Sequence, residues 1–172
     1  MISKVLFLDR DGVLNRDKGY VSKIEDIEVF PRTFESLRSI QEKGYVFFVI
    51  TNQSGIGRGY LSLDEYLQLE KNFRDLYRSH GVNLVDFFFC PHDPTKIECG
   101  CRKPGIELFE SAIAKHNLSL ENSVMIGDKY SDLHGAQNVG VQKLIYLSSR
   151  LPSDIPANFV WASSWPEIAA II

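Results

Sequence analysis

Short apolar runs alternate with helical patterns along this chain, and the alternation limits the folds that it can adopt. The runs that predict buried strands cover residues 5–8, 45–50, 84–89, 123–126 and 143–147. Helices are expected near residues 34–40, 62–80, 106–116 and 131–138, and the second has the capping-box pattern of Ser62 and Glu65. The tail is expected to add an edge strand near 159–161 and a final helix. The pattern predicts an α/β fold with a parallel sheet.

Polar clusters follow four of the predicted strands, at Asp9, Thr51, Cys90 and Asp128. In a three-layer Rossmann-like sheet with helices on both faces, ligands bind beyond the carboxyl ends of the strands, so these clusters should meet at one edge. The stretches 51–59 and 90–103 are expected to be loops. No linker divides the 172 residues, which favours a single domain over residues 1–172. The intervals between clusters leave no room for a large cap domain.

The charge and the apolar runs exclude several classes of partner. Lys and Arg number 19 against 22 Asp and Glu, and the net charge of −3 gives no basic excess for nucleic acid or an anionic membrane. No run approaches the ~20 apolar residues of a membrane span, and the run at residues 5–8 is too short for a secretory signal. We therefore expect a cytoplasmic protein without nucleic-acid or membrane partners. The lack of a long exposed apolar stripe favours a monomer.

Carboxylates follow two of the predicted strands. Asp9 and Asp11 lie two residues apart after the first strand, and Asp128 follows a later strand. Carboxylates this close need a cation or a shared proton, and Mg²⁺ suits a site with few carboxylates plus a substrate phosphate. Each pattern alone is typical of a surface turn or a helix cap, and only the combination favours a cation. Asp132 is expected to bind backbone N–H groups or to cap the helix that begins near Ser131.

Two further residues offer groups that a phosphoryl ligand needs. Thr51 supplies a hydroxyl at the end of the second strand, and Lys103 supplies a positive charge. Each of these residues alone is more often structural or solvated. The sequence contains no GxxxxGK[ST] segment and no GxGxxG after the first strand, which removes the main support for nucleotide binding of those two kinds.

All three cysteines lie in one loop with a histidine. Cys90, His92, Cys99 and Cys101 form a Cys₃His set within twelve residues. Such a set predicts a closed tetrahedral Zn²⁺ site, which is structural because no open position remains for a reactive water. The alternative is three buried thiols beside a surface histidine. That alternative leaves the concentration of all the cysteines in the zinc loop, residues 90–103, unexplained, and clustered cysteines favour a reducing compartment.

Together these segments resemble the haloacid-dehalogenase-like superfamily of phosphotransferases. The DRDGVLN segment at Asp9 is similar to the first motif of that superfamily, Thr51 to the second and Lys103 to the third. The GDK segment at Asp128, with Asp132, is similar to the fourth. The resemblance runs from about residue 5 to residue 141, most of the chain.

The resemblance implies a role for each motif. Asp9 would be the nucleophile that forms an aspartyl-phosphate, and Asp11 would protonate the leaving oxygen and then activate water. Mg²⁺ would lie between Asp9, Asp128 and the backbone carbonyl of Asp11. Thr51 and Lys103 would hold the phosphoryl oxygens. An acid close to a carboxylate nucleophile can serve both proton transfers of such a reaction.

Within the superfamily the chain is similar to the D-glycero-D-manno-heptose 1,7-bisphosphate 7-phosphatases. The resemblance rests on the DKGYV segment at Asp17, on TNQSGI followed by Arg58-Gly59, and on the CxH…CxCRKP loop. It implies that a phosphorylated sugar is bound by Asp17, Lys18, Gly19, Tyr20, Thr51, Asn52, Gln53, Ser54, Arg102, Lys103 and Lys129.

Two alternatives remain from the sequence. Histidinol-phosphate phosphatases share the zinc loop, and the six residues between His92 and Cys99 are closer to the spacing of that group. A zinc-loop binding module on an inactive scaffold, for example for nucleic acid, is the other alternative. The acidic balance and the presence of all the motif residues argue against such a module.

Overall fold

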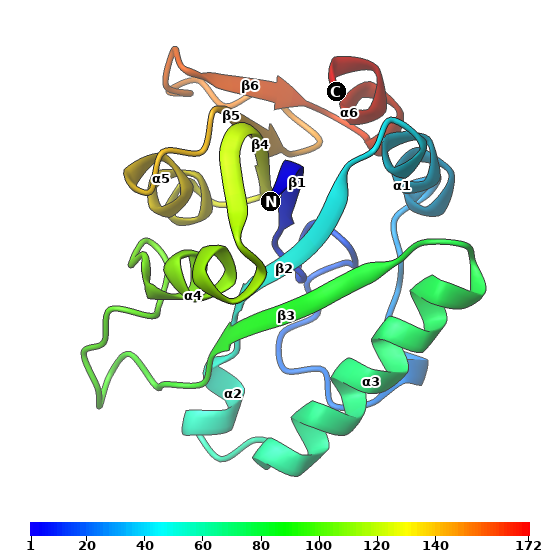
Figure 1. Ribbon diagram of the computed structural model, residues 1–172. Helices are drawn as coiled ribbons and strands as arrows, with labels where there is room; N and C mark the ends of the chain where they lie inside the picture. Colours follow the sequence, from blue (N-terminus) through cyan, green and yellow to red (C-terminus); the bar gives the residue numbers. More distant parts are fainter.

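A parallel sheet of six strands runs through the centre of the computed structural model, which describes residues 1–172 (Figure 1). The strand order is β3-β2-β1-β4-β5-β6. The strands are β1 (Ile2–Leu8), β2 (Val46–Asn52), β3 (Leu84–Cys90), β4 (Leu118–Gly127), β5 (Lys143–Leu147) and β6 (Phe159–Ala162). The helices are η1 (Ile24–Asp26), α1 (Thr33–Glu42), α2 (Ser54–Gly57), α3 (Leu63–Ser79), α4 (Glu107–His116), α5 (Tyr130–Asn138) and α6 (Trp165–Ile171).

Helices cover both faces of the sheet, as predicted for a three-layer α/β fold (Figure 1). Leu6 and Leu8 of β1 pack in the cluster that α1, α3 and α6 share, while Val5 and Phe7 pack on the other side with α4 and α5. Successive side chains of a strand point to opposite faces, so a central strand must be apolar at every position. This requirement explains the continuous apolar runs in the sequence. The predicted edge strand and final helix are also confirmed, as β6 and α6.

Two elements differ from the sequence-based prediction. The stretch 51–59, expected to be a loop, extends β2 to Asn52 and contains the single turn α2. Strand β4 begins at Leu118 rather than near residue 123, because Leu118 pairs with Ile2 before the register shifts. Residues 119–122 are Ser, Leu, Glu and Asn, so this stretch lacks the continuous apolar run from which the other buried strands were predicted. The Ser62–Glu65 capping box at the start of α3 is present as predicted.

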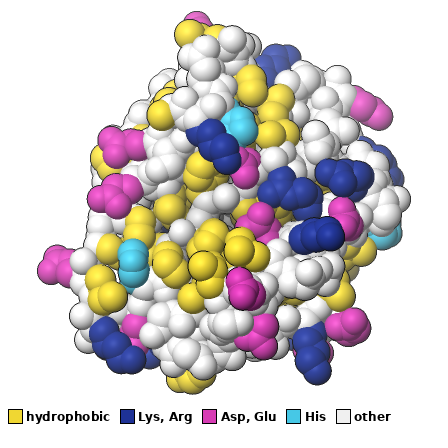
Figure 2. Space-filling model, turned by 60° about the horizontal axis from the view of Figure 1, so that its bottom comes forward, with side chains coloured by type: hydrophobic (Ala, Val, Ile, Leu, Met, Phe, Trp, Pro, Cys, Tyr) yellow, Lys and Arg dark blue, Asp and Glu magenta, His cyan; other side chains and the backbone are white.

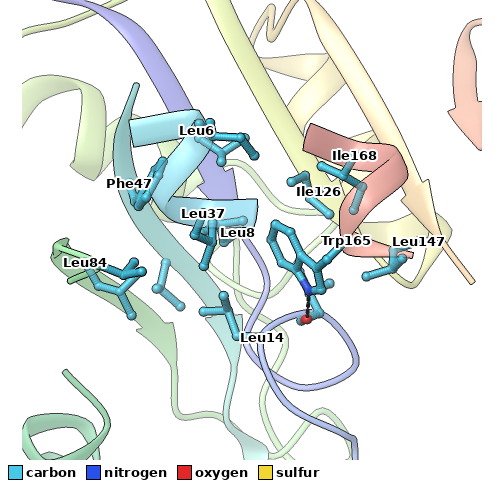
Figure 3. Packing of buried hydrophobic residues seen from close by; sticks show 14 of the residues in the cluster. Leu6, Leu8, Leu14, Leu37, Phe47, Leu84, Ile126, Leu147, Trp165 and Ile168 are labelled. Carbon is cyan, nitrogen blue, oxygen red and sulfur yellow. Dashed lines mark hydrogen bonds between the residues drawn. The ribbon is translucent and has the colours of Figure 1, made fainter. Parts of the chain in front are cut away.

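Two buried side chains hold the segment that follows β1. The indole Nε1 of Trp165 in α6 donates to the carbonyl of Val13 at 3.0 Å (Figure 3). The hydroxyl of Tyr77 in α3 donates to the carbonyl of Leu14 at 2.7 Å. Buried carbonyls that would otherwise lack a partner are thereby satisfied. The packing of two helices therefore fixes the turn that carries Asp9 to Asn15.

No cap domain covers the carboxyl edge of the sheet. The connection from β1 to α1 spans residues 9–32 and holds only η1, and the connection from β3 to α4 spans residues 91–106. The site at this edge is bounded by these two connections, by α2 and by the start of α5. None of the helices has the length and apolar character that crossing a membrane requires.

Candidate active site

The polar clusters that follow separate strands meet at the carboxyl edge of the sheet, as predicted. Residues of these clusters line a cavity of about 350 Å³. Figure 2 shows the molecule with the α2 end turned forward, and on this face Lys and Arg side chains lie close to Asp and Glu side chains. The lining residues are Asp9, Asp11, Asp17, Gly19, Tyr20, Thr51, Asn52, Gln53, Ser54, Gly55, Arg102, Lys103, Lys129, Ser131 and Asp132. Only one of these fifteen, Tyr20, is hydrophobic, so the cavity suits a polar ligand.

A buried lysine joins two carboxylates at the base of this cavity. Lys103 Nζ lies 3.0 Å from Asp9 Oδ1 and 2.8 Å from Asp132 Oδ1, and it also donates to the carbonyl of Ile50 at 2.6 Å. Asp132 Oδ2 accepts from the backbone N–H of Lys129 at 3.1 Å, which is the first of the two roles expected for Asp132 from the sequence, a contact with a backbone N–H group of the loop. Asp9 receives both of its hydrogen bonds, from Lys103 and from the N–H of Arg10, on Oδ1. Its Oδ2 is therefore available to a ligand.

Asp128 lies beside Asp9 and completes a group of three carboxylates. One ligand atom each of Asp9, Asp128 and Asp132 lies within 4.8 Å of the others. Asp128 Oδ1 is buried and has no hydrogen-bond partner. The neighbouring turn leaves space for this carboxylate only because residue 12 is glycine. A Cβ there would lie 2.1 Å from Asp128 Oδ2, and Gly12 also has a φ of +88°.

Burial controls the charge of these carboxylates. Burial raises the pKa of Asp9 to about 6, although the positive charge of Lys103 opposes that shift. Burial, and next the neighbouring charge of Asp9, raises the pKa of Asp128 to about 7. Burial lowers the pKa of the Lys103 ammonium group, but the negative charges of Asp132 and Asp9 have the larger effect, and the net shift is upward. A cation bound between Asp9 and Asp128 would therefore lower both pKa values and favour the ionised carboxylates.

Asp11 is held in one orientation by three side chains. Arg10 donates to it through Nη2 at 2.7 Å and Nε at 3.1 Å, Asn15 Nδ2 donates at 3.0 Å, and Gln53 Nε2 at 2.9 Å. Sequence reasoning gave Arg10 and Asn15 no role, and it missed their contacts with Asp11. The sequence feature that could have indicated these contacts is the position of the two residues: Arg10 is adjacent to Asp11, Asn15 follows it by four residues, and all three lie in a motif that follows a buried strand.

The residues expected to bind a substrate lie around the cavity, with one exception. Lys18 does not line it, because its Nζ lies 3.1 Å from Glu28 Oε2. Lys129 reaches Asp17 across the cavity mouth at 3.3 Å. Arg102 Nη1 is buried without a hydrogen-bond partner, and Arg102 lines the cavity. A buried guanidinium N–H without a partner is costly, so this position favours an anionic ligand.

The three cysteines and His92 come together at the start and end of the loop after β3. The structure has no disulfide. Cys90 Sγ lies 3.7 Å from both Cys99 Sγ and His92 Nδ1, His92 Nδ1 lies 3.2 Å from Cys101 Sγ, and the Cys99 and Cys101 sulfurs are 3.4 Å apart. Tetrahedral Zn²⁺ with Zn–S bonds of about 2.3 Å separates its sulfur ligands by about 3.8 Å. The four groups could therefore hold a metal ion.

Curated relatives resemble the chain over nearly its whole length. A protein from Helicobacter pylori (strain 26695), named D-glycero-beta-D-manno-heptose-1,7-bisphosphate 7-phosphatase, is 40% identical over 171 residues, covering 99% of this chain and 98% of that protein. The chain belongs to the heptose-bisphosphate phosphatase family. Another family member, D-glycero-alpha-D-manno-heptose-1,7-bisphosphate 7-phosphatase from Photorhabdus laumondii, is 38% identical over 159 residues, or 89% of this chain and 87% of that protein.

The family assignment agrees with a profile match and with the fold. The profile described as "HAD-hyrolase-like" matches residues 100–155, which include Lys103, Asp128 and Asp132. A solved structure of D,D-heptose 1,7-bisphosphate phosphatase from B. bronchiseptica, complexed with magnesium and phosphate, superposes with a TM-score of 0.86. It covers 98% of this chain and 97% of its own at 22% identity, so it shows a common fold. The family resemblance predicted from the sequence is thereby confirmed.

Proposed function

We propose that the protein hydrolyses the 7-phosphate of a D-glycero-D-manno-heptose 1,7-bisphosphate through an aspartyl-phosphate. The observation that carries the proposal is the placement of Asp9. Its carboxylate is buried between Lys103 and Asp128 at the base of a polar cavity, and its Oδ2 has no protein hydrogen bond. The names of the two relatives support the substrate class.

The reaction divides into two steps at phosphorus. In the first, an oxygen of Asp9 bonds to phosphorus while the bond from phosphorus to the sugar oxygen breaks, and Asp11 gives its proton to that oxygen. In the second, Asp11 takes a proton from a water molecule that attacks phosphorus, which releases phosphate and restores Asp9. Arg10, Asn15 and Gln53 hold Asp11 so that one carboxyl group serves both proton transfers.

The same residues fit a magnesium ion. Asp128 has a buried carboxylate oxygen without a partner, and Asp9 has an oxygen without a hydrogen bond, while both oxygens of Asp132 are occupied by Lys103 and a backbone N–H. We therefore assign Asp9 and Asp128, with the backbone carbonyl of Asp11, as the ligands. When bound, Mg²⁺ would offset the negative charge of the phosphoryl group facing these carboxylates. Thr51 and Lys103 would hold the phosphoryl oxygens.

The rest of the cavity suits a second phosphate. Arg102 has a buried donor without a partner, and Lys129 lines the same cavity. A substrate with two phosphates can place one at Asp9 and the other near these cations. The two relatives are named for different anomers of the sugar, so the proposal includes both. The spacing of six residues between His92 and Cys99 favours histidinol phosphate as the second candidate substrate.

Rates of phosphate release from a substrate panel test this function. We expect kcat/KM to be highest for heptose 1,7-bisphosphate, lower for fructose 1,6-bisphosphate and lowest for histidinol phosphate. A higher kcat/KM for histidinol phosphate would replace the proposed substrate. Salt-sensitive nucleic-acid binding without any phosphate release would instead support the binding-module alternative. Chelation by EDTA should stop release, and added Mg²⁺ should restore it.

The stability of the metal-free protein should depend on pH through Asp9 and Asp128. Their folded-state pKa values, about 6 and about 7, lie above the ordinary carboxyl value because the groups are buried. A raised carboxyl pKa stabilises the folded state at low pH, and that contribution is lost as pH rises through the two values. Protons and Mg²⁺ therefore compete for the same oxygens.

We expect Mg²⁺ to stabilise the protein strongly at about pH 8 and little at about pH 5. The apparent affinity should fall as pH drops through about 7 and then about 6, approaching tenfold per pH unit for each proton displaced. The Mg²⁺-induced rise in melting temperature, measured across this range, checks the prediction. An equal rise at both ends would contradict it. Asp128→Asn should bind Mg²⁺ more weakly and show a shallower pH dependence.

A further inference from the structure

We infer that Arg58 is a positioning residue: its ion pair with Asp93 connects α2 to residues 90–103, here called the cysteine loop, and so holds the cavity wall formed by residues 53–55. Arg58 does not line the cavity, and Asp93 follows His92 directly in the loop. Arg58 Nη2 lies 3.2 Å from Asp93 Oδ1. The inference rests on the proposed function only for the substrate used in one of its measurements.

Backbone contacts beside this ion pair join the same two segments. The N–H of Gln53 donates to the carbonyl of Cys90, and the N–H of Gly57 donates to the carbonyl of Pro91, both at 2.8 Å. The approach is so close that a side chain at residue 57 has no space. A Cβ there would lie 2.5 Å from the backbone nitrogen of Asp93. The α2 segment and the cysteine loop therefore pack backbone against backbone.

The ion pair between Arg58 and Asp93 is formed by side chains, so a substitution can remove it without changing the backbone contacts described above. The Asp93 side chain is 4% exposed and that of Arg58 is 27% exposed. The other cation near Asp93, Lys96, is exposed and lies 3.7 Å away. A charge pair that is largely removed from water is screened less than a surface pair, and loss of one partner leaves the other buried. Arg58 is therefore the nearer of the two cations beside Asp93, whose Oδ1 also accepts from the N–H and the hydroxyl of Thr95.

The position of α2 affects the chemical groups on its other side. Gln53 immediately precedes α2, and its Nε2 donates to Asp11 Oδ2 and to Thr51 Oγ1, both at 2.9 Å. Ser54 and Gly55, in α2 itself, line the cavity. A shift of α2 would therefore change both the contact that orients Asp11 and the wall that faces the substrate.

A helix as short as α2 cannot hold its own position. It comprises four residues, two of them glycine. A single turn gains too few hydrogen bonds to offset the cost of helix nucleation, so outside contacts must determine where it lies. The contacts to the cysteine loop are of this kind. This loop thus acts on the reaction indirectly, through Arg58 and α2.

Arg58→Gln tests the inference through kinetics and through hydrogen exchange. We expect KM for heptose 1,7-bisphosphate to rise about tenfold, with a smaller fall in kcat, because the substrate wall is displaced. Amide exchange in residues 53–60 should accelerate, while exchange in α3 should not. Arg58→Lys retains a cation and should recover most of the KM. The matched control is Arg74→Gln, since the Arg74 side chain is 23% exposed and pairs with Glu70 away from the cavity; its KM should equal that of the wild type.

Asp93→Asn and the double variant complete the test. If the pair acts as one unit, the double variant should lose no more than the worse single variant. Unchanged KM and unchanged exchange in Arg58→Gln would overturn the inference, as would strictly additive losses in the double variant. If the wild type does not hydrolyse the heptose substrate, the proposed function fails. The exchange comparison between residues 53–60 and α3 still decides the role of Arg58.

Discussion

Asp9→Asn is expected to lower kcat by at least about 10⁴-fold, a loss typical of removing a nucleophile that acts with its partners as a unit. The amide has no anionic oxygen to attack phosphorus. The fold should persist, because burial already disfavours the charged carboxylate at this position and Lys103 keeps Asp132 at 2.8 Å as a partner. Phosphate release under saturating substrate measures the loss, and circular dichroism reports the fold.

Two controls separate the chemistry of Asp9 from a general effect. Asp75→Asn makes the same change at an exposed residue of α3 that pairs with Arg78, and it should leave kcat unchanged. Rapid quenching of the wild-type enzyme during turnover should trap phosphate on Asp9 as an acyl phosphate. A kcat for Asp9→Asn within about tenfold of the wild type would exclude Asp9 as the nucleophile.

Much of the fold follows from the sequence because the sheet is covered on both faces. A central strand such as β2 must be apolar at each position, so the run from Tyr45 to Ile50 stands out from its surroundings. Parallel strands also end at a common edge. That rule brought Asp9, Thr51 and Asp128 together in the prediction without any knowledge of the connections between strands.

The parts that could not be predicted depend on contacts between distant segments. The turn α2 contains two glycines and forms against the cysteine loop, so its own sequence does not indicate a helix. Lys18 lies beside cavity residues in the sequence, but its long side chain pairs with Glu28 instead. The three side chains that hold Asp11 include Gln53, which is 42 residues away. Hydrophobic periodicity contains no information about such polar contacts.

Substitution of a metal ligand in the cysteine loop is expected to have the second large effect, a loss of bound zinc and of thermal stability. Four of the pairs among the Cys90, His92, Cys99 and Cys101 ligand atoms are 3.2 to 3.7 Å apart, close to the spacing of ligands around one tetrahedral ion. Four protein ligands would close the site, which is why we assign Zn²⁺ a structural role there. Zinc binding to such a site contributes directly to folding, with apparent free energies of about 10–16 kcal/mol in isolated zinc-finger peptides.

His92→Asn should therefore abolish stoichiometric zinc and lower the melting temperature by at least about 10 °C, since a loss of only about 4 kcal/mol suffices in a domain of this size. Elemental analysis and thermal unfolding measure the two effects. His116→Asn is the matched control, because His116 pairs with Asp86 outside the loop, and it should retain one zinc per chain. Purified wild-type protein without zinc would refute the assignment. Retention of zinc by His92→Asn would remove His92 from the ligand set.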